Sequence, residues 1–301
     1  MAYSPIVKQK LLQKDIYKLL QQRGSEWLKK HVVFADRQLV VLNKPPGVIS
    51  QLGVSGTKKE RESAATLDPI FRDIKNWIHT AHPHSVHRLD KATTGTLLVA
   101  LNATAATALS RQFQQGTISK TYLALVRGGE KSFSAMSGEI KEPLAYVDGR
   151  GDIKRGGKEA LTKWELVASS PKAPLSLLRL QLLTGNKHQL RIHLAKALKV
   201  PIVGDTSHSQ TSLHPSIAAL NIPEDRLFLH ASEISLYKYH EHGPRYHLGI
   251  RAPLPSDFKR ICHDAGIVIP LDERVPGLSI SDKVVGDEVS ELKLWEPKSV
   301  Y

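Results

Sequence analysis

The densest group of reactive side chains in this chain lies between His87 and Gly95. Asp90 follows Arg88 there, in a polar stretch that leads into the apolar run Leu97 to Ala100. An opposite charge beside a carboxylate keeps it ionised at neutral pH, so Asp90 could act as a nucleophile or as a stabiliser of positive charge. A salt bridge that caps a turn uses the same residue types, and for an isolated Arg-Leu-Asp triplet it is the more common case.

A second polar group opens a predicted helix. Asn186, Lys187, His188 and Arg191 lie at the start of a stretch, 187–198, in which leucines recur every four positions. Backbone amides at a helix start, with cationic side chains beside them, suit a phosphate or a carboxylate. A solvated basic helix face explains the same pattern equally well.

A tyrosine interrupts a third, otherwise apolar segment. Tyr122 lies in the predicted strand 121–126, two residues after Lys120. A buried tyrosine most often fills the core and forms a hydrogen bond through its hydroxyl. It could instead reach a substrate ring, for stacking or for proton transfer.

The elements that would position these groups follow from the apolar periodicity. Two short apolar runs at 32–34 and 39–42 predict a hairpin, and helical spacing predicts helices over 67–77, 104–114 and 187–198. Further strands are predicted at 97–100, 121–126, 164–167, 176–183, 227–236 and 246–250. Because strands and helices are mixed without a regular βαβ rhythm, we predict an α+β fold. It would be a single domain with a mixed, largely antiparallel central sheet, flanked by helices and carrying an active-site cleft.

The charge and composition of the chain indicate which class of partner it binds. A formal net charge of +13 and a pI near 9.7 favour polyanions, with nucleic acid first. An anionic membrane surface is the competing interpretation, but it requires a basic amphipathic helix with a strongly apolar face. No apolar run approaches the roughly 20 residues that span a bilayer. With Cys262 as the only cysteine, a disulfide framework is excluded, so we expect a soluble protein of a reducing, intracellular compartment.

The first thirty residues form a basic segment. Seven lysines and arginines accompany two acidic residues, and apolar residues recur at helical spacing from Leu12 to Leu20. One interpretation is a mitochondrial presequence, although such segments favour arginine and serine over the lysine and glutamine found here. The other is an ordinary helix lying on the domain, in a cytoplasmic or nuclear protein.

Four histidines, His79, His82, His84 and His87, are close enough in sequence to suggest a metal site. A metal-dependent hydrolase would be the function that such a site implies. There is no carboxylate pair or cysteine nearby, and Pro83 prevents the four from sharing one helical face. We therefore predict that no metal binds.

Taken together, three motifs resemble the RluA-type pseudouridine synthases in order and spacing. They are His87-Arg88-Leu89-Asp90 with Thr94-Gly95, then Lys120-x-Tyr122-x-Ala124-x-Val126-x-Gly128, then Thr184-Gly185-x-x-His188-Gln189-Leu190-Arg191-x-His193 with Pro201-Ile202-x-Gly204-Asp205. The likeness covers roughly 31–258. It implies a pseudouridine synthase catalytic domain at 31–260, between a basic amphipathic extension at 1–30 and a C-terminal extension at 261–301.

The resemblance also implies a role for individual residues. Asp90 matches the family's catalytic aspartate, which attacks the target nucleotide or stabilises the intermediate while the uracil is detached, rotated and rejoined through a carbon atom. Tyr122 matches the tyrosine that contacts the uracil ring and is a candidate for the final proton abstraction. Arg191 matches the arginine that pairs with the catalytic carboxylate, and Arg88 the motif arginine, which we assign to RNA positioning.

The remaining expectations concern partners. RNA contacts are predicted at His87, Arg88, Lys120, Asn186, Lys187 and His188. No cofactor, metal or membrane is expected, and the protein is expected to be a monomer. Ribosomal RNA is the first substrate prediction, including mitochondrial large-subunit ribosomal RNA, and transfer RNA is the second. The alternative function is that of a catalytically silent RNA-binding or chaperone protein on the same fold.

The chain departs from the family's pattern in two places. Asn186 stands where the family usually has an arginine, and Thr206-Ser207-His208-Ser209 stands where a tyrosine-glycine pair often follows Gly-Asp. Both departures bear on substrate affinity more than on catalysis.

Overall fold

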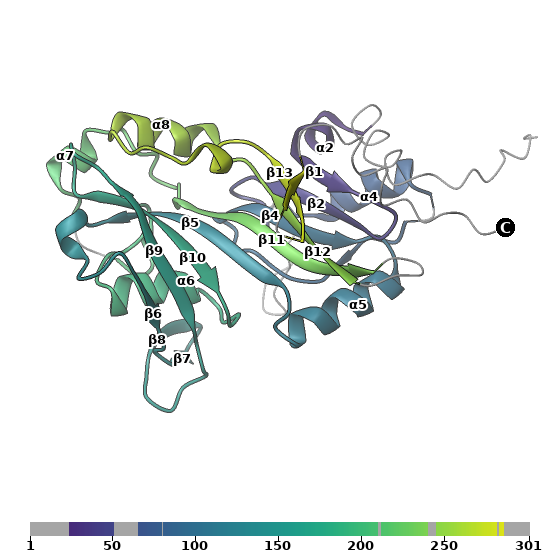
Figure 1. Ribbon diagram of the computed structural model, residues 1–301, viewed down its shortest axis with the longest axis horizontal. Helices are drawn as coiled ribbons and strands as arrows, with labels where there is room; N and C mark the ends of the chain where they lie inside the picture. Colours follow the sequence, from purple (N-terminus) through teal and green to yellow (C-terminus); the bar gives the residue numbers. More distant parts are fainter. Residues whose placement is uncertain are drawn as a thin grey trace, which may run out of the picture.

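The computed structural model describes residues 24–50, 66–79, 81–209, 212–239, 245–281 and 283–285. One twisted, mixed sheet runs along the molecule, with helices against both faces (Figure 1). Its central path has the order β1 (Val32–Ala35), β2 (Leu39–Lys44), β4 (Thr94–Ala100), β11 (Leu229–Tyr239), β5 (Ser119–Arg127), β10 (Leu175–Leu182), β9 (Thr162–Ser169) and β6 (Ser137–Ile140). The predicted α+β fold is confirmed.

The other elements branch from this path or cover it. β3 (His84–Ser85) pairs with β4, and β12 (Arg245–Arg251), β13 (Gly277–Ile280) and β14 (Lys283–Val285) continue outward from β11. β7 (Leu144–Val147) and β8 (Arg150–Ile153) form a separate two-stranded ribbon. The helices are α2 (Glu26–His31), α4 (Asp68–Trp77), α5 (Ala103–Gln114), α6 (Gln189–Ile192), α7 (Pro215–Ala218) and α8 (Ser256–Asp264), with short 3₁₀ turns at Glu130–Ser132 and Leu271–Glu273. No helix in the described ranges is long and apolar enough to cross a bilayer.

A late strand joins the two halves of the sheet. β11 pairs in parallel with β4 at Thr94 and Gly95 and antiparallel with β5, while every other pairing among the described strands is antiparallel. The parallel contact is close, because a Cβ at Gly95 would overlap the carbonyl of Ala231. Gly95 also has a φ of +108°, which favours glycine. Its position fixes the start of β4, directly after the Asp90 loop.

The side chains of β5 alternate between two cores, as strand geometry requires. Tyr122 and Ala124 face a core shared with α4 and α6, whereas Leu123 and Leu125 pack against α8 on the other face. Tyr122 is therefore directed to the face of the sheet that also carries α6.

Most of the predicted elements are present. The hairpin at 32–42, the helices at 67–77 and 104–114 and the strand pair near 227–250 are confirmed within a few residues. The helix predicted over 187–198 is a short α6 followed by a wider π-helical turn, His193–Ala197. β6, β7 and β8 were not predicted, because each is only four residues long and none alternates between apolar and polar residues; β7 is apolar throughout, whereas β6 and β8 are largely polar.

The two predicted domain boundaries, at residues 31 and 260, lie within helices that pack into the core. Residue 260 lies inside α8, whose Ile261 and Cys262 are fully buried against β5 and β10, so the structure shows no division there. Leu28 of α2 is also fully buried in the main core, so the domain begins before residue 31. The rest of the basic segment predicted as a helix, 1–23, lies outside the described residues.

Candidate active site

The loop that carries Asp90 is held by the segment that follows β2. The Ser50 hydroxyl donates to the carbonyl of Leu89 at 2.7 Å and accepts from the N–H of Leu89 at 3.0 Å. The carbonyl of Lys91 accepts from the N–H of Gly47 at 2.9 Å and from Nζ of Lys44 at 3.1 Å. The residues on both sides of Asp90 are thus fixed by hydrogen bonds.

Lys44 is the deepest of these supports. Its side chain is fully buried at the end of β2, and Nζ also donates to the carbonyls of Pro45 and Val48, each at 3.1 Å. Burial lowers the pKa of Lys44 to about 7, although the nearby charge of Asp90 acts in the opposite direction.

We expect Lys44→Met to lower the free energy of unfolding by about 2 kcal/mol or more, because one buried and two partly buried carbonyls lose a donor. The deficit should grow between about pH 7 and pH 10. In that window the unfolded lysine keeps a proton that the folded one has released, so the wild type gains stability as the pH rises. Chemical denaturation of both proteins across this range measures the effect. A variant as stable as the wild type at every pH would contradict it.

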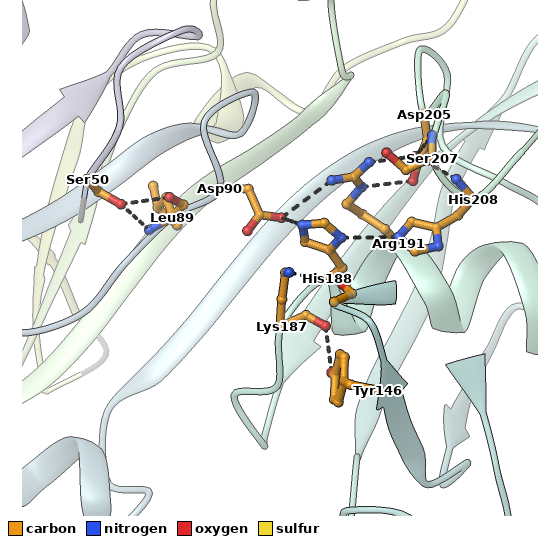
Figure 2. A network of polar contacts seen from close by, with 11 residues as sticks. Ser50, Leu89, Asp90, Tyr146, Lys187, His188, Arg191, Asp205, Ser207 and His208 are labelled. Carbon is orange, nitrogen blue, oxygen red and sulfur yellow. Dashed lines mark hydrogen bonds and ion pairs between the residues drawn. The ribbon is translucent and has the colours of Figure 1, made fainter. Parts of the chain in front are cut away.

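Two cationic or hydrogen-bonding side chains approach one oxygen of Asp90. Oδ2 lies 3.8 Å from Nη1 of Arg191 and 3.7 Å from Nε2 of His188 (Figure 2). Among the described residues, Oδ1 has no hydrogen-bonding partner. The Asp90 side chain is 20% exposed. The structure thus brings together the aspartate and arginine that the motifs predicted as partners.

The tightest contact of Arg191, however, is with Asp205. Nε and Nη2 donate to the two carboxylate oxygens at 2.9 and 2.7 Å, which leaves Nη1 directed at Asp90. Burial would raise the pKa of Asp205, but the hydrogen bonds and charge of Arg191 outweigh it, and the pKa is lowered. Sequence analysis did not assign Asp205 a role. Its only signal was its place in the Gly204-Asp205 motif.

Tyr122 lies on the same face of the sheet and is buried. In the part of the chain that the structure describes, no group hydrogen-bonds its hydroxyl. Burial, and secondly the charge of Asp90, raises the pKa of Tyr122 well above its ordinary value. The hydroxyl therefore stays protonated at neutral pH and lies close enough to Asp90 to respond to its charge.

A cavity of about 460 Å³ opens beside these groups. Asp90, Arg191 and His188 line it together with Arg88, while Glu224 and Asp225 lie on its wall as well. A volume of this size is typical of sites that hold a small molecule or one extruded base.

Four of the six residues predicted to contact RNA fall into two groups, according to whether their side chains already form hydrogen bonds. Arg88, which is exposed, and Lys120, which is partly buried, have no ion pair or hydrogen bond within the described ranges, so their charges are available to a phosphate. Lys187 donates to the carbonyl of Gly149 at 3.0 Å, and Asn186 donates to the carbonyl of Glu159 at 2.7 Å. These two side chains hold neighbouring loops in the structure as it stands.

The side chain of His87 supports β4 and packs against α5. Its Nε2 accepts the N–H of Leu98 in β4 at 2.8 Å, and its ring stacks on Phe113 with the centroids 4.9 Å apart. Burial lowers the pKa of His87 to about 3, so the ring is neutral at neutral pH. This geometry gives Nε2 of His87 a structural role in β4 and leaves Nδ1 as the donor nitrogen of the ring, so the RNA contact of His87 stays a prediction.

The anion site predicted at the start of the helix 187–198 does not have the expected backbone geometry. α6 is only four residues long, and His188 before it has a left-handed φ of 53°. The N–H of Asn186 is bound by Oε1 of Gln189 at 3.1 Å, an oxygen that also accepts from the hydroxyl of Thr184 at 2.8 Å. The turn is therefore satisfied by its own side chains, and His188 and Arg191 face Asp90.

Comparison with known proteins assigns the class. Residues 38–196 match the model of the family described as RNA pseudouridylate synthase, and the chain belongs to this family. The resemblance to RluA-type pseudouridine synthases is thereby confirmed.

Individual relatives and structures agree with this assignment. A protein from Pectobacterium carotovorum subsp. carotovorum named tRNA pseudouridine synthase C is 32% identical over 224 residues, which cover 71% of this chain and 57% of the relative. One from Nitrosomonas europaea named ribosomal large subunit pseudouridine synthase D is 30% identical over 238 residues, covering 79% of this chain and 65% of the relative. The chain thus spans somewhat more than half the length of these relatives. The solved structure of human RNA pseudouridylate synthase domain containing 4 superposes with a TM-score of 0.65 at 23% identity, covering 84% of this chain and 98% of that one, which shows the shared fold.

Proposed function

We propose that the protein is an RNA pseudouridine synthase that isomerises a uridine in a structured RNA, with Asp90 as its catalytic carboxylate. The observation that carries this proposal is the cavity in which Asp90 meets Arg191, 3.8 Å away. In the reaction, the glycosidic carbon–nitrogen bond breaks and a carbon–carbon bond to the same ring forms. The ring carbon loses its hydrogen as a proton and the ring nitrogen gains one, so the isomerisation involves no net oxidation and requires no cofactor.

Each residue of the site has a place in this scheme. The target base leaves its stack and enters the cavity beside Asp90. The ring of Tyr122, buried on the same face of the sheet, would offset part of the unstacking energy, typically a few kcal/mol, once the base reaches it. Oδ1 of Asp90, which has no described partner, is the oxygen that approaches the nucleotide. Arg191 and His188 stabilise the charge on Oδ2 from the other side.

The substrate is proposed from charge and from relatives. The net charge of +13 suits a large folded RNA, and the relatives named above act, by their names, on transfer RNA and on the ribosomal large subunit. We propose ribosomal RNA first and transfer RNA second. The basic segment that precedes α2, 1–23, supports a mitochondrial location and hence mitochondrial large-subunit ribosomal RNA.

Transcriptome-wide mapping of pseudouridine in cells with and without the gene tests the substrate. One ribosomal position that loses its pseudouridine is expected, and a loss confined to transfer RNA would replace the first substrate with the second. Imaging of a fusion tagged at the C-terminus tests the location, and fluorescence confined to the cytoplasm or nucleus would overturn the mitochondrial proposal.

We expect Tyr122→Phe to lower kcat by roughly 10- to 100-fold, because the hydroxyl that relays the final proton is lost. The ring remains, so RNA affinity should stay within about twofold of the wild type. Tyr122→Ala should weaken binding as well, since base stacking is worth about 1–3 kcal/mol. Single-turnover release of tritium from labelled uridine, combined with filter binding, separates the two effects. A Phe variant with unchanged kcat would remove the hydroxyl from the mechanism.

A further inference from the structure

The rings of His188 and His208 meet beside Asp90. Nδ1 of His188 lies 3.2 Å from Nε2 of His208, and the rings pack edge to face, with centroids 5.4 Å apart at an angle of 84°. The other ring nitrogen of His188, Nε2, lies 3.7 Å from Oδ2 of Asp90. His188 therefore lies between His208 and the carboxylate (Figure 2).

The positions of the hydrogens follow from this arrangement. A neutral imidazole has one N–H donor and one acceptor nitrogen, so one of the two histidines must donate in the contact between them. If His188 donated through Nδ1, its unprotonated Nε2 would face the carboxylate lone pairs of Asp90, which is repulsive. If His208 donates through Nε2 instead, the hydrogen of His188 is on Nε2 and is directed at Asp90. The second arrangement provides the donor between the two rings and directs the remaining N–H of His188 at Oδ2 of Asp90, 3.7 Å away.

His208 is itself held by the loop that fixes Arg191. Oδ1 of Asp205 accepts the N–H groups of Ser207 and His208 at 3.0 and 3.1 Å, while the same carboxylate binds Arg191. One loop, 205–208, thus contacts both side chains that approach Oδ2 of Asp90. Asp205 binds Arg191, and His208 contacts His188. Asp205 belongs to the motif that the family shares, whereas His208 lies in the stretch, 206–209, in which this chain departs from the family's usual sequence.

Burial keeps both rings neutral, although the nearby carboxylates act in the opposite direction. The groups that act on His188 are Asp90, Arg191, His208 and Lys187, and those that act on His208 are Asp205, Arg191, Lys196 and Asp90. Burial is the largest influence on each, and the pKa of each histidine is lowered from its ordinary value. Two neutral rings at neutral pH are what the hydrogen-bond arrangement requires.

We propose that His208 is a positioning residue that holds His188 in the tautomer with hydrogen on Nε2, so that His188 donates to Asp90 during the reaction. This inference rests on the proposed function, because it takes Asp90 as the reacting carboxylate. The hydrogen bond stabilises the negative charge on Oδ2 when the carboxylate is regenerated and the product forms. Because a histidine's tautomer is set by the partner of its other nitrogen, loss of His208 should free His188 to exchange between tautomers.

The tautomer can be measured on the free, full-length protein. NMR of the imidazole nitrogens should show His188 protonated on Nε2 in the wild type and as a mixture of tautomers in His208→Ala. In His208→Gln the side-chain amide nitrogen can occupy the place of Nε2 and donate to His188, so the single tautomer should return. His263→Gln, an exposed change on α8, is the matched control and should leave the signals of His188 as they are. A wild-type His188 protonated on Nδ1, or an unchanged tautomer in His208→Ala, would overturn the proposal.

The kinetic result should follow the tautomer. For His208→Ala we expect kcat to fall roughly 3- to 10-fold with KM within about twofold of the wild type, and His208→Gln should recover most of the loss. Equal losses in the Ala and Gln variants would show that the side chain only supports the loop, and would overturn the positioning role. A wild type that forms no pseudouridine on any RNA would instead contradict the proposed function, while the NMR result would still decide the hydrogen-bond arrangement.

Discussion

Replacing Asp90 by Asn should lower pseudouridine formation by at least about 1000-fold while leaving the fold and RNA binding intact. Asn has the same shape but cannot attack as a carboxylate, so the loss falls on the chemical step. Stability should change little, because the side chain has no contact with its cationic neighbours shorter than 3.7 Å. The loop itself is held through the backbone of its neighbours, Leu89 and Lys91.

The measurement is single-turnover conversion of a target RNA, together with filter binding of the same RNA. Asp264→Asn, a partly exposed carboxylate on α8, is the control and should behave as the wild type. If Asp90→Asn still converted the RNA at a rate within tenfold, the assignment of the catalytic carboxylate would be wrong. If binding were lost with the activity, Asp90 would be a recognition residue, and the catalytically silent alternative would gain support.

The second large effect is expected at Arg191. Arg191→Met should lower the free energy of unfolding by about 3–5 kcal/mol, because it leaves the fully buried Asp205 without its partner. It should also reduce activity severely, since Nη1 is one of the two groups that face Asp90. Arg191→Lys keeps a charge but cannot bind both oxygens of Asp205, so it should recover only part of either loss. Urea denaturation and single-turnover conversion measure the two effects separately.

The pH dependence of stability provides an independent check on this ion pair. Against the effect of burial, Arg191 lowers the pKa of Asp205 in the folded protein. The pair therefore stabilises the fold fully above the unfolded carboxyl pKa of about 3.9, and this contribution is lost as the pH falls towards the folded value. The difference in stability between the wild type and Asp205→Asn should be constant near neutral pH and shrink below about pH 4. A difference that persisted at the lowest pH would show that the carboxylate charge is not what stabilises the fold.

Much of the site could be predicted because its residues lie in motifs of fixed order. The resemblance of these motifs to the RluA-type pseudouridine synthases implied the roles of Asp90, Tyr122 and Arg191, and the structure places all three around one face of the sheet. Their supports were not predictable in the same way. Lys44, Asp205 and His208 act through contacts that join distant parts of the chain, and nothing in their local sequence marks the partner. His87 shows the converse, because a histidine within a reactive motif proves to support the backbone of β4.

The same reasoning explains the errors in the fold. Strong apolar runs identified β2, β4, β5 and β10, which are buried. The strands β6 and β8 are largely polar, and β7 is an apolar run of only four residues. The boundary at residue 260 was placed by the end of the resemblance. Burial of α8 against the sheet, which only the folded chain reveals, shows that the domain continues beyond it.

The place of β11 between β4 and β5 has a consequence for biosynthesis. A chain that emerges from the ribosome up to residue 196 contains Asp90, Tyr122 and Arg191, yet lacks the strand that joins their two halves of the sheet. Nascent chains of that length should therefore have no competent centre, and truncation before residue 229 should produce an inactive, aggregation-prone fragment with unpaired strand edges. Enzymatic competence is in this sense one of the last properties that the growing polypeptide acquires.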